Sequence, residues 1–176
     1  MGNQQERQVA EARLAMFFET EGYFTIRAIK RGKDRPYDLK PIVGVTNTSK
    51  DLIEWAASTL DEMNVGRYVQ WVKPHGLGKL PQGRVLVEGL KRVETFLPIL
   101  RPWMLVKTRQ ADLIKEFIDS RVDNMGDYTQ HEIDIANEVR QMAAKGPKAA
   151  LLESSETLCR NPKWTKAAKD KIKSDL

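Results

Sequence analysis

The feature that most constrains the fold is a helical stretch that ends at a glycine and passes without a loop into an alternating strand. Residues 7–21 place Leu14, Phe17 and Phe18 on one apolar face at helical spacing, and Gly22 ends the pattern. The next nine residues, YFTIRAIKR at 23–31, alternate apolar and polar side chains with the period of a half-buried strand. The sequence therefore predicts a helix that leads directly into the first strand of a sheet.

Three later stretches alternate in the same way, at 38–47, 67–73 and 83–89. Turn-forming residues such as GKDRP separate the first pair of strands, and a Gly/Pro-rich segment separates the second pair. Two hairpins are therefore expected, and Val69 and Trp71 of the second should point inward.

Helical spacing fills the remaining intervals. Ser49 is placed to cap a helix that ends near 64–66. Another helix should begin around Glu88 and stop before Pro102, which cannot continue it. Further helices are expected over roughly 107–119, 127–143 and 149–174. The predicted order is αββαββα followed by two C-terminal helices.

Composition narrows the class of protein. With 176 residues and 41% hydrophobic content, the chain can build one real core. It has one cysteine, no apolar run of membrane length, and a polar start unlike a secretory signal. We expect a soluble, intracellular protein with no membrane partner. These features do not distinguish an organelle from a prokaryotic cytoplasm or a phage-infected cell.

The net charge of +5 is unevenly distributed along the chain. Residues 23–50 contain seven Lys or Arg against two acids, whereas residues 110–141 contain three against eight. Residues 145–176 are again basic, with eight Lys or Arg against four acids. This separation favours a positive surface suited to a polyanion, although a solvated charge run explains it equally well.

Three segments in chain order carry a family resemblance. LAMFFETEG at 14–22 resembles the LAGLIDADG motif, with Leu-Ala first, acids at the sixth and eighth positions, and glycine at the ninth. Val45-Thr46-Asn47 and the stretch RPW at 101–103 with KTRQA at 107–111 resemble segments of single-motif LAGLIDADG homing endonucleases encoded in group I introns. The resemblance covers about residues 8–120.

The resemblance implies an α+β protein with the αββαββα homing-endonuclease fold, a saddle-shaped antiparallel sheet and C-terminal helices. The endonuclease core would span 7–122, and a helical extension with a basic tail would span 123–176. One motif per chain implies a homodimer on a long, pseudo-palindromic double-stranded DNA target. The activity implied is metal-dependent cleavage of both DNA strands.

Glu21 is the expected metal ligand. A carboxylate at a helix C-terminus lies beside unsatisfied carbonyls and the negative end of the helix dipole, which together favour a cation. Hard oxygen ligands suit Mg²⁺, or another divalent cation such as Mn²⁺. By resemblance, Glu21 and the backbone carbonyl of Thr20 would hold the metal. From its own spacing alone, Glu21 is better explained as a solvated acid that ends a helix, and the metal role depends on the following strand and the other matching segments.

Two further residues match catalytic positions of the family. Lys107 would stabilise charge that develops on the scissile phosphate, and Asn47 would order water beside the metal. Their alternatives are a lysine in the first turn of a helix and an asparagine in the turn before one.

The outward residues of the four strands would lie in the major groove, with nearby cations on phosphate. This expected DNA-binding set is Thr25, Arg27, Arg31, Lys40, Gln70, Arg84, Arg109, Lys145 and Lys148. Each one alone is also compatible with an ordinary solvated surface, but the alternation in all four strands favours a shared function.

The second face of the 7–21 helix is the expected dimer interface: Ala12, Ala15, Met16, Glu19 and Thr20. Of these, Glu19 is expected to be structural. Met16 and Thr20 are larger than the small residues usual at these motif positions, and Glu21 stands where Asp is more usual. Two alternatives to the nuclease remain on the same fold. One is a cleavage-inactive DNA-binding regulator, and the other is an intron-splicing maturase that binds intron RNA.

Overall fold

The computed structural model describes residues 2–30, 37–74, 80–123 and 126–143. The elements in chain order are α1 (Gly2–Thr20), β1 (Gly22–Lys30), β2 (Tyr37–Asn47), α2 (Lys50–Glu62), β3 (Tyr68–Val72), β4 (Gln82–Glu88), α3 (Leu90–Leu100), the 3₁₀ helix η1 (Arg101–Trp103), α4 (Thr108–Asp123) and α5 (Gln130–Ala143). The predicted α+β class and αββαββα order are confirmed. The helix expected over 149–174 lies outside the described residues.

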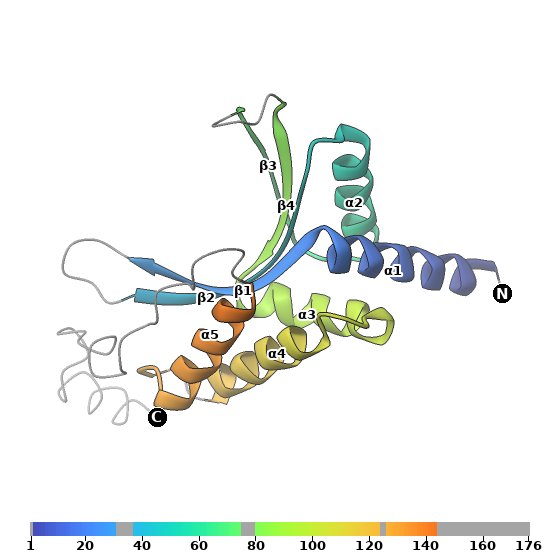
Figure 1. The fold of residues 1–176 in the computed structure, drawn as a ribbon. Coiled ribbons are helices and arrows are strands. Elements are labelled where there is room, and N and C mark those ends of the chain that lie inside the picture. Colours follow the sequence, from blue (N-terminus) through green and yellow to red (C-terminus); the bar gives the residue numbers. More distant parts are fainter. Residues whose placement is uncertain (1, 31–36, 75–79, 124–125, 144–176) are drawn as a thin grey trace, which may run out of the picture.

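Helix α1 begins five residues earlier than the apolar pattern predicted. Residues 4–9 are all exposed, and the N-terminal end of α1 projects away from the other helices (Figure 1). An apolar pattern marks only the part of a helix that has a buried face, so it cannot detect this extension. The exposed Pro98 lies within α3, which nevertheless continues to Leu100 and gives way to η1 at Pro102.

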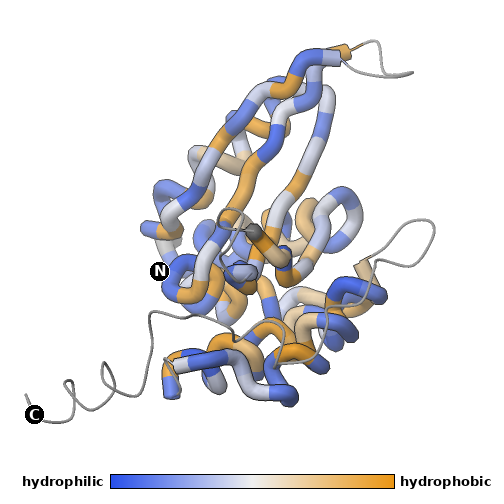
Figure 2. The backbone as a smooth tube through the Cα atoms, turned by 90° about the vertical axis from the view of Figure 1, so that its left-hand side faces the viewer, coloured by the Kyte–Doolittle hydropathy of each residue, from blue (hydrophilic) through white to orange (hydrophobic). Residues whose placement is uncertain are grey.

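The four strands form one antiparallel sheet in the order β1-β2-β4-β3. Gly22 pairs with Val45 and Val45 with Val85, so the two hairpins meet along β2 and β4. The helices lie together on one side of the sheet (Figure 1). The helix-facing strand residues are apolar and buried: Phe24, Ile26, Leu39, Val43, Val45, Val85 and Val87. This matches the predicted alternation, which is visible along the strands in Figure 2.

We call the opposite side the outer face. It carries Tyr23, Thr25 and Arg27 of β1, Lys40, Ile42, Gly44 and Thr46 of β2, Arg84, Leu86 and Glu88 of β4, and Tyr68 and Gln70 of β3. Trp71 is on the helix-facing side, as expected, but it is exposed because β3 is an edge strand. Its ring lies over Gly83, where an added Cβ would come within 2.9 Å of it.

The core is continuous from α1 to α5. Phe18 of α1 packs edge-on against Phe96 of α3, with ring centroids 5.1 Å apart. Helix α5 adds Ile135, Ala136 and Val139 to the same cluster of buried side chains. This helix is therefore packed as part of the body that contains the sheet. No helix among the described residues is both long and apolar enough to cross a membrane.

Candidate functional site

The chain changes from helix to strand at the end of α1 with almost no connection. The N–H of Glu21 donates to the carbonyl of Phe17 at 3.0 Å, and β1 starts at the next residue, Gly22. A Cβ at Gly22 would collide with the carbonyl oxygen of Phe18 and lie 2.8 Å from that of Gly44. Only glycine fits this close approach. Gly22 therefore fixes the position of Glu21 against the sheet.

Glu19, in the last turn of α1, accepts hydrogen bonds from a segment far away in the sequence. One of its carboxylate oxygens, Oε1, accepts from the backbone N–H groups of Leu105 at 2.7 Å, Val106 at 2.5 Å and Lys107 at 3.1 Å. Three consecutive N–H groups around one oxygen form an anion-binding nest before α4, where the helix dipole also favours negative charge. Glu19 thus fastens the segment before α4 to the end of α1.

The electrostatics of Glu19 agree with this geometry. Partial burial raises the pKa of its carboxyl, while the hydrogen bonds from Lys107, Val106 and Leu105 and the charge of Lys107 lower it. The net effect is a pKa below the ordinary value. The hydrogen bonds outweigh desolvation, so Glu19 is held in its charged form.

Lys107 is brought beside Glu21 by the same segment. Its Nζ donates to the carbonyl of Gly22 at 2.6 Å and to that of Phe18 at 3.4 Å. Its own carbonyl accepts from Ala111 N–H at 3.0 Å, which makes Lys107 the N-cap of α4. The structure therefore brings together two residues that the sequence analysis singled out separately.

A bidentate ion pair holds the preceding turn. Arg101 of η1 donates to both carboxylate oxygens of Asp112 in α4, at 2.7 Å and 3.0 Å. The segment that carries Lys107 is thus tied to α4 on one side and, through Glu19, to α1 on the other.

The carboxylate of Glu21 differs from that of Glu19 in its partners. The Glu21 carboxylate is exposed and has no hydrogen bond or ion pair within the part of the chain that the structure describes. No group of three or more His, Cys, Asp or Glu side chains in that part could hold a metal ion. One chain thus offers a single free carboxylate beside the last carbonyls of α1. These oxygen donors suit Mg²⁺, and further ligands would have to come from a second copy, the substrate or water.

Asn47 lies at the same end of the sheet, two residues beyond Val45, the partner of Gly22. Its Oδ1 accepts from the N–H of Ser49 at 2.8 Å, which forms the turn before α2. Ser49 in turn caps α2 by accepting from Leu52 N–H at 3.4 Å, as predicted. The geometry of Asn47 corresponds to its structural interpretation, and a role in ordering water stays a prediction.

The predicted DNA-binding residues divide by their partners. Arg27 and Gln70 are exposed on the outer face, and Thr25 is half-buried there. Lys40 pairs with Glu88 at 2.7 Å. Arg84 lies between Thr46 and Gln70 in register, and its Nε is buried without a partner among the described residues.

Arg109 lies apart from this group. It donates to Glu138 of α5 through Nε at 3.2 Å and through a terminal nitrogen at 3.0 Å. Arg31, Lys145 and Lys148 lie outside the described residues.

The predicted dimer face is only partly available. Ala15 is buried within its own chain and Glu19 is bonded to 105–107, whereas Met16 is 68% exposed. Beside them lie Leu105 and Val106, exposed by 85% and 82%. Neither residue was predicted from the sequence to belong to the interface. The available signal was a pair of apolar residues directly before Lys107, in a segment with no helical pattern.

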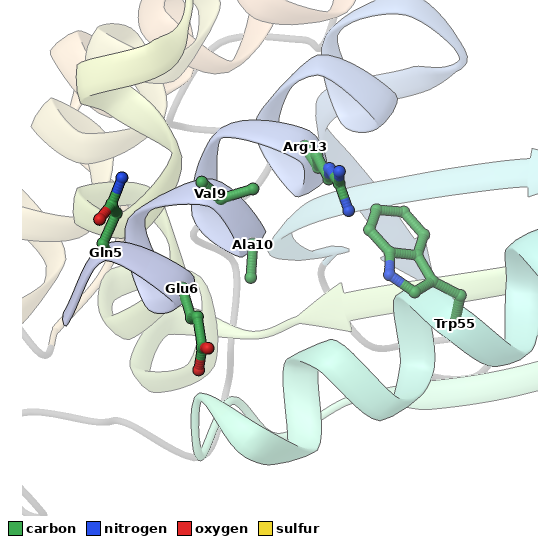
Figure 3. A pocket seen from close by; sticks show the side chains of 6 residues that line it. All are labelled: Gln5, Glu6, Val9, Ala10, Arg13 and Trp55. Atoms are coloured by element: carbon green, nitrogen blue, oxygen red, sulfur yellow. The ribbon is translucent and has the colours of Figure 1, made fainter. Parts of the chain in front are cut away.

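A separate cavity of about 470 Å³ lies between the N-terminal half of α1 and α2 (Figure 3). Gln5, Glu6, Val9, Ala10, Arg13 and Trp55 line it. The guanidinium of Arg13 lies beside the indole of Trp55, which packs against Phe17 with centroids 5.9 Å apart. Glu6 is the one acidic residue that lines the cavity. Arg13, the α1 lining residue nearest to Glu21 in sequence, is about 12 Å from it along the helix. The cavity is therefore distinct from the Glu21 and Lys107 site.

Comparison with known proteins identifies the fold. No family model and no curated protein sequence matches the chain. Among solved structures, the homing endonuclease I-CvuI in complex with its target in the presence of calcium matches with a TM-score of 0.62 and 20% identity. The match covers 88% of this chain and 94% of that one. A complex of I-CvuI with the I-CreI target in the presence of magnesium, with uncleaved DNA, gives a TM-score of 0.59.

Two further matches differ in how much of each chain they cover. The archaeal intron-encoded homing endonuclease I-Vdi141I, complexed with DNA, has a TM-score of 0.60 and 18% identity over 80% of this chain and 87% of that one. The LAGLIDADG homing endonuclease I-GzeII, also with a DNA target, has a TM-score of 0.55 and 16% identity. The match covers 53% of the I-GzeII chain, so this chain spans about half of its length. The protein therefore has the LAGLIDADG homing-endonuclease fold.

Proposed function

We propose that the protein is a sequence-specific endonuclease of double-stranded DNA that acts as a homodimer with a divalent metal ion. The observation that carries the proposal is the pair of Glu21 and Lys107 at the end of α1. The Glu21 carboxylate has no partner among the described residues, and the ammonium group of Lys107 donates to the carbonyl of Gly22, the next residue. An acid for a metal and a cation for a phosphate are the groups that phosphodiester hydrolysis needs. The fold supports the proposal, because matched structures with this fold contain DNA targets.

The chain's own residues would divide the work as follows. Glu21 and the Thr20 carbonyl hold Mg²⁺, or another divalent cation such as Mn²⁺, which when bound activates water and stabilises the leaving oxygen. Lys107 places its positive charge where the scissile phosphate becomes more negative. Glu19 positions Lys107 by holding 105–107 against α1. Asn47 borders the same end of the sheet and would order water there.

The outer face would lie in the major groove, because a polar sheet face with outward Arg and Gln side chains can contact base edges. Among the proposed contacts on this face, Lys40 is paired with Glu88, whereas Arg27, Gln70 and Arg84 have no ion-pair partner among the described residues. Arg31, Lys145 and Lys148 are kept as proposed DNA contacts from the sequence alone.

The decisive experiment incubates the protein with a randomised duplex library, with Mg²⁺ or with EDTA, and sequences the new DNA ends. Wild type should produce defined ends only with the metal, and Glu21→Gln should reduce them by about 100-fold or more while duplex retention persists. Glu62→Gln is the matched control, since Glu62 is an exposed carboxylate at the last position of α2. It should cleave like wild type.

Three results would redirect the proposal. Specific duplexes retained without any ends would indicate a DNA-binding regulator. Preference for structured intron RNA over duplex DNA would indicate a maturase. Equal cleavage by wild type and Glu21→Gln would remove Glu21 from the site.

Dimerisation would occur through α1 and the neighbouring segment, where Met16, Leu105 and Val106 are exposed apolar side chains. Two copies would bring two Glu21 carboxylates to one seam, which is consistent with one motif per chain and with the half-length match to I-GzeII. Met16→Glu should therefore yield monomers in light scattering and lose double-strand cleavage. Val122→Glu, at an apolar site of 54% exposure in α4, should remain dimeric. A wild-type monomer in the presence of DNA would contradict the homodimer.

A further inference from the structure

One line of residues across the outer face differs chemically from the lines on either side. Tyr23 pairs with Gly44, Gly44 with Leu86, and Leu86 with Tyr68, so the four residues cross all four strands. We call these four residues the apolar row. The neighbouring line on one side contains Thr46, Arg84 and Gln70, and the neighbouring line on the other side contains Thr25, Ile42 and Glu88. One line beyond Glu88, Arg27 lies opposite Lys40, which pairs with Glu88. The apolar row thus has Arg84 in the neighbouring line on one side and Arg27 two lines away on the other.

Gly44 makes the apolar row flat. A Cβ built on Gly44 would lie 2.8 Å from both Cζ and the hydroxyl of Tyr23, and 2.7 Å from Cδ2 of Leu86. The tip of the Tyr23 ring and the end of Leu86 therefore occupy the space that any other residue at 44 would take. Without a side chain in the middle, the phenol lies across the sheet instead of standing away from it.

The row presents aromatic surface above a closed apolar layer. Leu86 and the adjacent Ile42 are buried, Tyr23 is half-buried, and Tyr68 is 53% exposed. Burial raises the pKa of the Tyr23 phenol, while the charges of Arg27 and Arg84 lower it and that of Glu88 raises it. The phenol therefore stays neutral at physiological pH and lies within electrostatic reach of the flanking arginines.

Thymine is the base that fits such a surface. In the major groove its distinguishing group is the C5-methyl, which is read by apolar contact, whereas guanine and adenine are read by Arg and by Gln or Asn. Arg84 on one side and Arg27 further out on the other can attract phosphates, whereas the apolar row between them has no charged side chain.

We propose that the apolar row reads the 5-methyl groups of pyrimidines in the DNA target, and that Gly44 is the specificity residue that keeps the row flat enough to do so. This inference rests on the proposed function, because it needs a specific duplex in the major groove. Adjacent rows are two residues apart, about 6.8 Å along a strand, which corresponds to about two base pairs. The thymines should therefore lie about two base pairs from the purines contacted by the row of Arg84 and Gln70.

The test starts from a duplex selected by the wild-type protein. Each thymine is replaced singly by uracil, which removes only the methyl group, and each cytosine by 5-methylcytosine, which adds one. At the positions that face the apolar row, uracil should weaken binding about fourfold, the ratio that corresponds to about 0.8 kcal/mol for one buried methyl-sized group. A methylated cytosine at the same positions should bind more tightly than cytosine.

Two variants connect the effect to the apolar row. Tyr68→Ala changes an exposed side chain and should bring the thymine-to-uracil ratio toward one at the position that Tyr68 contacts. Gly44→Ala should displace Tyr23 and Leu86. It should therefore bring the thymine-to-uracil ratio toward one at every position that faces the apolar row. Gly66→Ala, in the turn before β3, and Gln70→Ala, in the neighbouring row, should both keep the fourfold ratio.

The outcomes separate this inference from the proposed function. Specific duplexes with equal affinity for thymine and uracil at every position would overturn methyl reading and leave DNA recognition intact. An unchanged ratio in both Tyr68→Ala and Gly44→Ala would show that another part of the protein reads the methyl groups. If no specific duplex is selected at all, the proposed function and this inference fail together.

Discussion

The end of α1 and the outer face of the sheet are both rich in polar side chains, but their polar groups are used differently. At the end of α1, Glu19 bonds to three backbone N–H groups and Lys107 to two carbonyls, and only Glu21 is left unbonded among these three described side chains. On the outer face Arg27 and Gln70 are exposed, and the buried Nε of Arg84 has no partner among the described residues. The chain thus satisfies the polar groups that shape the end of α1 around Glu21, whereas it leaves donors open on the outer face.

The two glycines that border these regions give the largest expected contrast. Gly22→Ala would push a Cβ into backbone oxygen atoms, which cannot move without opening the junction of α1 and β1. We expect a loss of about 3 kcal/mol in the free energy of unfolding. Gly44→Ala meets only the ends of two side chains and should cost less than about 1 kcal/mol. Urea titration followed by circular dichroism would measure both.

Equal losses for the two alanine variants would break the comparison. They would mean that the outer face is as rigidly held as the end of α1.

Glu19 gives an intermediate effect with a defined pH dependence. Glu19→Gln removes the charge that the three N–H groups bind, and it should lower the free energy of unfolding by about 1 kcal/mol at pH 7. Because the folded-state pKa of Glu19 is lowered, its contribution is fully present above the ordinary value of 4.5. It should disappear as the pH falls through the lower folded-state pKa.

The measurement is the stability difference between wild type and Glu19→Gln as a function of pH. Glu6→Gln, at an exposed position of the same helix, should show no such difference. If the stability difference between wild type and Glu19→Gln grew as the pH fell, it would have the wrong sign and would exclude a bound carboxylate.

The smallest expected effect compares two arginines through the salt dependence of DNA binding. Arg27 is exposed on the outer face, whereas Arg109 already pairs with Glu138. Arg27→Gln should reduce the slope of log affinity against log salt by about 1, and Arg109→Gln by less than half of that. Fluorescence anisotropy at several salt concentrations gives both slopes.

The variant Glu138→Gln sharpens this test, because it releases Arg109. If Arg109 can reach phosphate, the slope should become steeper in Glu138→Gln. If the slope stays at the wild-type value, Arg109 is only a structural link between α4 and α5.

The sequence by itself determined the order of the elements, the faces of the strands and the position of Glu21 at the end of α1. These properties follow from local periodicity and local sterics: alternation sets the buried face of a strand, and Gly22 ends the helix. The metal role proposed for Glu21 and the catalytic role proposed for Lys107 rest on resemblance, and the structure brings Lys107 onto the carbonyl of Gly22, the residue after Glu21. The early start of α1 could not be predicted, because exposed residues carry no apolar pattern.

Only the tertiary structure decided which polar groups are occupied. The nest around Glu19, the pairing of Lys40 with Glu88 and that of Arg109 with Glu138 each join residues far apart in the chain. The same holds for the flat row over Gly44, which depends on the register of three strand pairs. Periodicity records how each residue meets its neighbours in sequence, whereas these contacts exist only after separate elements have packed together.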